Sequence, residues 1–280
     1  MLNVLEVVKK TSEFFASKGV ESPRLNAELL VSHALALGRM QLYLQFERPV
    51  SEAELAAIRE LVRRRGRREP LQYVIGFTDF CGLRLKTDRR ALIPRPETEF
   101  LVETLIARCE APPAHILDLG TGSGAIALAL ARAFPMASVT ASDSSRDALA
   151  LAEENAALAG LGGRVAWVES DWFGRLPAGP FDLVVSNPPY LSQPEVAAAA
   201  PEVRDHEPSG ALVSGDGGFS DLGRIIGGSA AYLAPGGLLA LETGTGHHGL
   251  AAAAAVRAGF SRTESVKDLA GRDRFFFARR

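Results

Sequence analysis

The four consecutive residues with the clearest chemical potential are Asn187, Pro188, Pro189 and Tyr190. They follow the apolar run 181–185, which predicts a buried parallel strand, and open α/β sheets bind ligands at the carboxyl ends of such strands. Asn187 offers a side-chain oxygen acceptor, and two successive prolines stiffen the turn so that a main-chain carbonyl can face a ligand. Tyr190 adds a flat aromatic surface. Two acceptors and a ring together suit an –NH2 group on a planar framework.

This arrangement would activate the nitrogen of a bound amino group. With both hydrogens held by acceptors, the lone pair is discouraged from delocalising and is aimed at an electrophile. The alternative interpretation is an ordinary strand-to-loop turn, because Asn-Pro is a common start of turns. A binding site for an electrophilic cofactor elsewhere in the sequence would favour the chemical interpretation.

A glycine-rich turn upstream has the features of such a cofactor site. It lies between an apolar strand at 115–119 and a helix at 125–134. Glycines at alternate positions let the backbone pass close to a ligand at the start of a helix, although a tight structural turn would have the same composition. The spacing GxGxG differs from the dinucleotide fingerprint GxGxxG. The residues expected to bind the cofactor here are Gly120, Thr121, Gly122, Ser123 and Gly124.

Acidic residues at three strand ends extend this half of the site. A second strand ends in Asp143, about twenty residues after the glycines, where an acid is placed to bind a ribose diol. Asp118, near the end of the first strand, either holds the turn or meets an ammonium group of the cofactor. Asp171 and Trp172 follow a third strand. We expect them to accept from an adenine amino group and to cover its flat face, the alternative being a capped loop with a core aromatic.

Taken in order, these motifs resemble a known family. The strand, the glycines, Asp143 and the Asp171-Trp172 pair resemble the cofactor motifs of class I S-adenosylmethionine-dependent methyltransferases, and the segment 187–190 resembles the motif of enzymes that methylate planar amino groups. Helices followed by a hairpin narrow the similarity to the release-factor glutamine methyltransferase family. Further motifs that support it are Ile93-Pro94-Arg95-Pro96-Glu97-Thr98-Glu99, Pro201-Glu202-Val203-Arg204-Asp205-His206-Glu207-Pro208 and the stretch 211–218.

The resemblance, which covers essentially the whole chain, implies a substrate and a cofactor. The substrate would be the glutamine side chain in the Gly-Gly-Gln loop of class I peptide-chain release factors, methylated on its amide nitrogen (N5). S-adenosyl-L-methionine would be the methyl donor and S-adenosyl-L-homocysteine the product. The residues alone do not choose between glutamine, adenine and guanine. The alternatives are a ribosomal-protein glutamine methyltransferase, a nucleic-acid adenine-N6 or guanine-N2 methyltransferase, and a non-catalytic cofactor-binding module.

The elements that must position these residues form three parts. Apolar residues at helical spacing predict a small helical bundle over 1–74, which we expect to recognise the substrate, and Ser51 with Glu54 predicts a capping box there. Alternating residues predict a β-hairpin connector over 75–92. Residues 93–280 are expected to form the α/β methyltransferase domain. The resemblance implies a Rossmann-like sheet of seven strands, with the final strand inserted antiparallel.

Three charged segments allow two interpretations each. The arginine-rich helix end at 63–68 is either a solvated face or a surface for an acidic partner or RNA. Arg95, Glu97 and Glu99 either stabilise a helix start or lie at the mouth of the site. The proline-containing loop 191–213 is typical of a lid, whose polar residues would brace Asn187 or meet substrate, with His206 in a scaffolding role.

Composition limits the remaining possibilities. A net charge of −2 gives no bulk attraction to nucleic acid, so we expect no stable nucleic-acid partner. Cys81 and Cys109 form no CxxC pair, and His247-His248 lacks companion ligands, so no metal site is predicted. The sequence has no signal-peptide pattern and no apolar stretch that approaches a membrane span. We expect a cytoplasmic, monomeric protein without membrane association.

Overall fold

The computed structural model describes residues 2–109 and 111–280. Met1 and Glu110, which fall within the predicted ranges 1–74 and 93–280, lie outside the described residues. The chain forms two compact units, one of Met1–Gly76 with Ala200–His206 and one of Phe77–Ala199 with Glu207–Arg280. The hairpin thus groups with the second unit, whereas 200–206 groups with the first. No helix within the described residues is long and apolar enough to cross a membrane.

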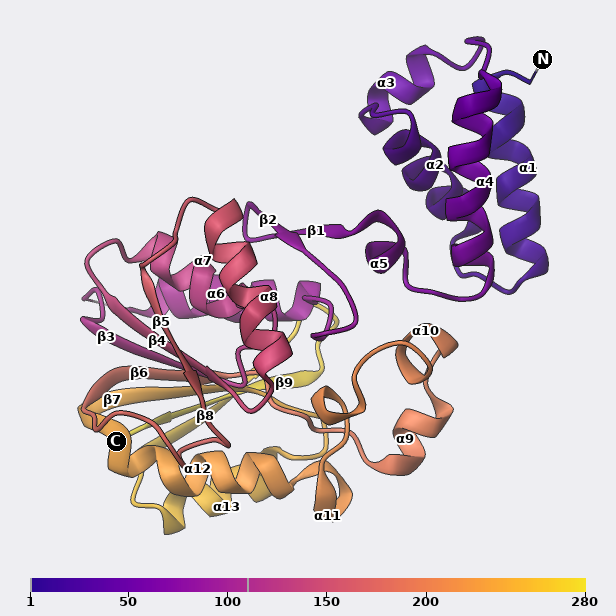
Figure 1. The fold of residues 1–280 in the computed structure, drawn as a ribbon. Helices are drawn as coiled ribbons and strands as arrows, with labels where there is room; N and C mark the ends of the chain where they lie inside the picture. The colour runs from indigo at the N-terminus through magenta and orange to yellow at the C-terminus, as the bar shows by residue number, and fades with distance from the viewer. Residues whose placement is uncertain (1, 110) are drawn as a thin grey trace. The chain divides into compact units, whose positions relative to one another are not determined.

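The first unit is a helical bundle (Figure 1). Its apolar core comes from residues at helical spacing, such as Val4, Val8 and Phe15 on the first helix. The predicted capping box is confirmed, since Ser51 accepts from the Glu54 amide and the Glu54 carboxylate accepts from the Ser51 amide. The helices are α1 (Val4–Ser17), α2 (Pro23–Ala34), α3 (Arg39–Leu44), α4 (Glu52–Gly66), α5 (Leu71–Ile75) and α10 (Pro201–Arg204).

Much of the arginine-rich end of α4 stabilises this unit internally. Arg64 pairs with Glu69 at 2.6 Å. Arg65, buried at 5% exposure, and Arg68 both pair with Glu202, at 2.9 and 2.6 Å. The two predicted interpretations, a solvated face or a partner surface, therefore apply only to the other arginines of the segment 63–68. Because a buried charge without a partner is costly, these pairs hold the segment 200–206 against the bundle.

The second unit contains the hairpin and an α/β sheet (Figure 1). Strands β1 (Phe77–Phe80) and β2 (Leu83–Lys86) pair antiparallel, which confirms the predicted hairpin. The sheet strands are β3 (His115–Leu119), β4 (Ser138–Asp143), β5 (Val165–Glu169), β6 (Phe181–Ser186), β7 (Leu233–Glu242), β8 (Arg262–Lys267) and β9 (Asp273–Arg279). The helices are α6 (Pro96–Arg108), α7 (Ala125–Ala133), α8 (Arg146–Leu158), α9 (Gln193–Ala198), α11 (Gly215–Gly218), α12 (Ser220–Tyr232) and α13 (His248–Arg257), with the 3-10 turn η1 (Ser209–Ala211).

The strand order is β5-β4-β3-β6-β7-β9-β8, a seven-stranded sheet within the described residues. Strands β3 to β7 are parallel, and β9 lies between β7 and β8, antiparallel to both. The predicted fold class and the antiparallel insertion of the final strand are confirmed. The order reverses at β3, which has β4 on one side and β6 on the other. Open α/β sheets place their ligand sites at the carboxyl ends of strands beside such a reversal.

Successive side chains along the central strands are buried on opposite faces of the sheet. Ile116 and Val185 belong to the core under α6 and α7, whereas Leu117 and Val184 belong to the core under α12 and α13. Figure 1 shows α6, α7 and α8 on one face of the sheet and α12 and α13 on the other. Since successive side chains of a strand point to opposite faces, continuous apolar runs such as 183–185 bury both.

Candidate active site

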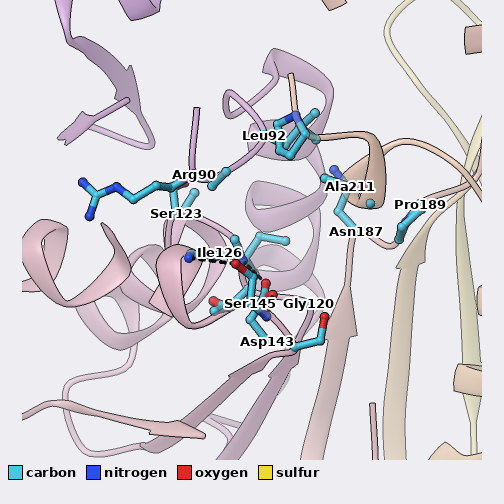
Figure 2. A pocket seen from close by; sticks show the side chains of 18 of the residues that line it. Arg90, Leu92, Gly120, Ser123, Ile126, Asp143, Ser145, Asn187, Pro189 and Ala211 are labelled. Carbon is cyan, nitrogen blue, oxygen red and sulfur yellow. Dashed lines mark hydrogen bonds between the residues drawn. The ribbon is translucent and has the colours of Figure 1, made fainter. Parts of the chain in front are cut away.

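A cavity of about 310 Å³ opens at the carboxyl ends of β3 to β6. This volume lies in the range of roughly 300 to 1,000 Å³ that is usual for small-molecule sites. In Figure 2, Gly120, Asp143 and Ser145 lie together, and Asn187 and Pro189 are separated from them. Of the predicted site residues, those that line the cavity are Gly120, Thr121, Gly122, Ser123, Asp143, Asp171, Trp172, Asn187 and Pro189. Gly124, Pro188 and Tyr190 lie outside the lining.

The glycine turn needs its glycines for backbone and packing reasons. Gly120, Gly122 and Gly124 have φ of +67°, +55° and +81°, which side chains rarely allow. A Cβ on Gly124 would lie 3.0 Å from that of Ala152 on α8, so this glycine serves packing and not the cavity wall. A Cβ on Gly122 would meet only Ala91, at 3.7 Å. Gly122 is therefore the position at which the open backbone faces the cavity.

Asp143 fixes the turn at the end of β4. Its Oδ2 accepts from the Gly122 amide and its Oδ1 from the Ser145 amide, both at 2.9 Å. Burial raises the pKa of Asp143, and these backbone hydrogen bonds act in the opposite direction. A carboxylate oxygen has more than one acceptor position, so both oxygens keep capacity for a ligand hydroxyl.

Asp118 holds the glycine turn from its buried side. It is fully buried, and its Oδ2 accepts from the Thr121 hydroxyl at 2.6 Å and from the Ala127 amide at 3.1 Å. Its Oδ1 has no hydrogen-bond partner among the residues that the structure describes. Asp118 does not line the cavity, so the geometry favours the first of its two predicted roles, holding the turn. Burial raises its pKa to about 7.

This buried acid predicts a pH-dependent stability. The folded state binds a proton at Asp118 up to about pH 7, whereas the unfolded chain loses it near pH 4, so its contribution to stability falls as pH rises between these values. We expect the unfolding free energy of Asp118→Asn relative to wild type to rise over this window. The total rise should reach a few kcal/mol, at about 1.4 kcal/mol per pKa unit. Urea unfolding of the cofactor-free protein from pH 4 to pH 8 measures it. The exposed Asp147→Asn is the control, and curves for Asp118→Asn that run parallel to wild type would contradict the prediction.

Trp172 and Asp171 form another wall of the cavity. Trp172 has φ +48°, and its ring lies over Gly120, where a Cβ would approach the ring to 3.2 Å. The indole Nε1 donates to Asp221 Oδ1 at 3.0 Å, while Asp171 pairs with Arg224 at 2.9 Å. The sequence reasoning missed Asp221 and Arg224, which also line the cavity. Neither belongs to a motif, so no local signal marked them.

Asn187 begins a chain of hydrogen-bonded side chains. Its Nδ2 donates to Thr98 Oγ1 at 3.1 Å, and the Thr98 hydroxyl donates to Glu242 Oε2 at 2.7 Å. The Tyr190 hydroxyl donates to Glu242 Oε1 at 3.1 Å, and the Arg274 guanidinium lies 5.7 Å from the centre of the tyrosine ring. Tyr190 thus supports the site from outside the cavity wall. Thr98 and Glu242 were not predicted, although Thr98 stands inside a family-like motif.

The segment before α6 forms the mouth of the cavity. Arg95 lines it and pairs at 2.6 Å with Glu207, which is buried and also accepts from the Ile93 amide at 3.3 Å. Glu97 and Glu99 do not line it. Glu207 belongs to the predicted lid 191–213. Its contacts with Ile93 and Arg95 show that it braces the segment before α6, rather than Asn187.

Comparisons with known proteins first define the class. A family model described as Methyltransferase small domain matches residues 96–203. A 16S rRNA N2 G1207 methyltransferase from T. thermophilus is 21% identical with a TM-score of 0.53, covering 73% of this chain and 49% of that one. A methyltransferase from Pyrococcus furiosus is 17% identical with the same TM-score, covering 71% and 89%. The fold and the site define an α/β methyltransferase.

The family follows from the whole length of the chain. A model described as PrmC N-terminal domain matches residues 6–76. The protein named release factor glutamine methyltransferase from Rhodopirellula baltica is 40% identical over 278 residues, and that from Geobacter sulfurreducens 42% over 271. Each alignment spans 97% of this chain and 94% of the relative. The chain belongs to the release factor glutamine methyltransferase family, as the sequence motifs predicted.

Proposed function

We propose that this enzyme transfers a methyl group from S-adenosyl-L-methionine to the N5 amide nitrogen of the glutamine in the Gly-Gly-Gln loop of class I release factors. One observation supports this most directly. In a chain of this family, the glycine turn and Asn187 line the same cavity, so a cofactor and an amino group can meet there. S-adenosyl-L-homocysteine would be the other product.

The residues present fit this cofactor. Asp143, with acceptor capacity on both oxygens, would bind the ribose hydroxyls, and Gly122 lets the cofactor approach the backbone. Trp172 would cover the adenine, and Asp171 would accept from its amino group. S-adenosylmethionine supplies a methyl group on a positively charged sulfur, which makes the carbon electrophilic. The chain's own contribution is to hold the acceptor nitrogen in line, which can lower a barrier by roughly 7 to 11 kcal/mol.

The substrate amide would be held by two acceptors. Asn187 Oδ1 would accept one amide N–H within the cavity, and the main-chain carbonyl of Pro188, which lies outside the lining, would have to be reached by the other, with Pro189 stiffening the turn. Tyr190 lies outside the cavity lining and donates a hydrogen bond to Glu242. It would therefore hold the 187–190 turn in place from outside the cavity. These contacts turn the nitrogen lone pair towards the methyl group.

The first unit would recognise the release factor. A shallow groove between α1 and α4 is lined by Phe14 and Val62 together with a set of basic residues, which suits an acidic protein surface. The basic residues are Lys18, Arg59, Arg63 and Arg67. We further propose that the enzyme acts in the cytoplasm as a monomer, without metal and without a stable nucleic-acid partner.

Methyl-transfer assays test the proposed function against its alternatives. The enzyme is incubated with tritiated S-adenosylmethionine and either a release factor, a release factor whose Gly-Gly-Gln glutamine is replaced by alanine, ribosomal proteins, or DNA and ribosomal RNA. We expect label only in the unaltered release factor. Label in ribosomal protein or in nucleic acid, with none in the release factor, would support one of the alternatives instead.

A further inference from the structure

The hydrogen bonds behind Asn187 have a fixed direction. Thr98 on α6 and Glu242 at the end of β7 are 4% and 1% exposed, so water does not compete for their bonds. An ionised carboxylate only accepts hydrogen bonds, and a threonine hydroxyl has one proton to donate. The Thr98 proton goes to Glu242 Oε2, at 2.7 Å. Towards Asn187, the Thr98 oxygen can therefore only accept.

This direction determines which end of the Asn187 amide faces the cavity. The oxygen and nitrogen of an asparagine amide are nearly equal in size, so packing alone distinguishes them poorly. Because Thr98 accepts, it requires Nδ2 at 3.1 Å and leaves Oδ1 for the cavity side. A reversed amide would present N–H groups to the N–H groups of the substrate. Donors would then oppose donors, and the acceptor amide would lose one of its two partners.

We propose that Thr98 and Glu242 are positioning residues that set the donor and acceptor ends of the Asn187 amide for methyl transfer. The inference rests on the proposed function, because it requires a substrate that donates N–H bonds. Glu242 belongs to none of the predicted motifs, and Thr98 belongs to the family-like motif 93–99 but was not predicted as a site residue. Glu242 lies outside the cavity lining and acts through Thr98, whereas Thr98 lines the cavity and acts through its hydrogen bond with the Asn187 amide.

Opposing influences act on the charge of Glu242, and the net effect is a raised pKa. Burial raises the pKa of Glu242, while the hydrogen bonds from Thr98 and Tyr190 and the positive charge of Arg274 act in the opposite direction. The negative charge of Glu97 also raises the pKa. The two hydroxyl donors and Arg274 thus favour the ionised form against burial, and an ionised carboxylate orients both hydroxyls towards it.

A pair of substitutions at Thr98 tests the proposal. Thr98→Val keeps the shape and removes the hydroxyl, whereas Thr98→Ser keeps the hydroxyl. With a release factor as substrate, we expect Thr98→Val to lower kcat about tenfold, with KM and the Kd for S-adenosylmethionine within about twofold of wild type. Thr98→Ser should keep kcat within about threefold. Equal kcat for Thr98→Val and wild type, or an equal loss in both variants, would overturn the proposal.

Glu242→Gln gives a second test that keeps the volume. Its carboxamide has a donor end and an acceptor end, so it no longer forces Thr98 to donate. We expect kcat to fall about tenfold at unchanged S-adenosylmethionine affinity and with a melting temperature near that of wild type, and this test stands if Thr98→Val does not fold. Full kcat in Glu242→Gln would overturn the proposal. A wild-type enzyme that does not label release factors would instead overturn the proposed function, so the two failures are distinguishable.

Discussion

Asn187→Ala is expected to lower turnover at least about a hundredfold while the affinity for S-adenosylmethionine stays within about twofold of wild type. The substitution removes the acceptor that would hold one amide hydrogen and leaves the glycine turn and Asp143 intact. Loss of one preorganised polar contact to the reacting group typically costs about 10²- to 10³-fold in kcat. Single-turnover transfer to a release factor measures the rate, and calorimetry measures cofactor binding.

A matched control separates this effect from the loss of any carboxamide. Gln193→Ala removes an exposed carboxamide at the start of α9, in the predicted lid but outside the cavity lining, and should leave turnover unchanged. A thermal melt checks that the Asn187→Ala variant still folds, because the substitution leaves Thr98 and Glu242 without their hydrogen-bonding neighbour. Wild-type turnover in a folded Asn187→Ala variant would refute the assigned role of the asparagine.

Asp143→Ala is expected to weaken S-adenosylmethionine binding at least about thirtyfold, or about 2 kcal/mol. Two contributions add: the carboxylate would lose its bonds to the ribose hydroxyls, and the Gly122 and Ser145 amides would lose the acceptor that shapes the turn. Hydrogen bonds to charged groups are worth roughly 1.5 to 3 kcal/mol each. Calorimetric titration of the cofactor measures the change.

The Asp143 prediction has its own internal control. Asp147 lies four residues later, in the first turn of α8, and is exposed. Asp147→Ala changes the net charge equally, so its cofactor affinity should match that of wild type. At saturating cofactor, Asp143→Ala should regain most of its kcat, because the residues that hold the substrate are intact. Unaltered affinity in Asp143→Ala would count against the ribose assignment.

The sequence by itself determined the helical first part, the hairpin and the strands that carry the site. Apolar residues at helical spacing predicted the bundle, short apolar runs predicted the strands at the site, and alternating residues predicted the hairpin. The glycine turn and Asp143 were both predicted and both line the cavity. These features are local, because backbone conformation and the face a residue occupies depend on its near neighbours in sequence. The antiparallel last strand came from the family resemblance alone.

Only the tertiary structure decided which distant polar side chains meet. Thr98 contacts Glu242 across 144 positions of sequence and Asn187 across 89. Arg65 and Glu202 are 137 positions apart, so the arginine-rich helix end alone did not reveal its internal partner. The Thr98 contacts depend on strand order and on how α6 packs beside the sheet, whereas the Arg65 contact depends on the return of the segment 200–206 to the helical unit. Periodicity specifies which face of an element is buried, but the polar groups that meet inside are fixed by the assembled fold.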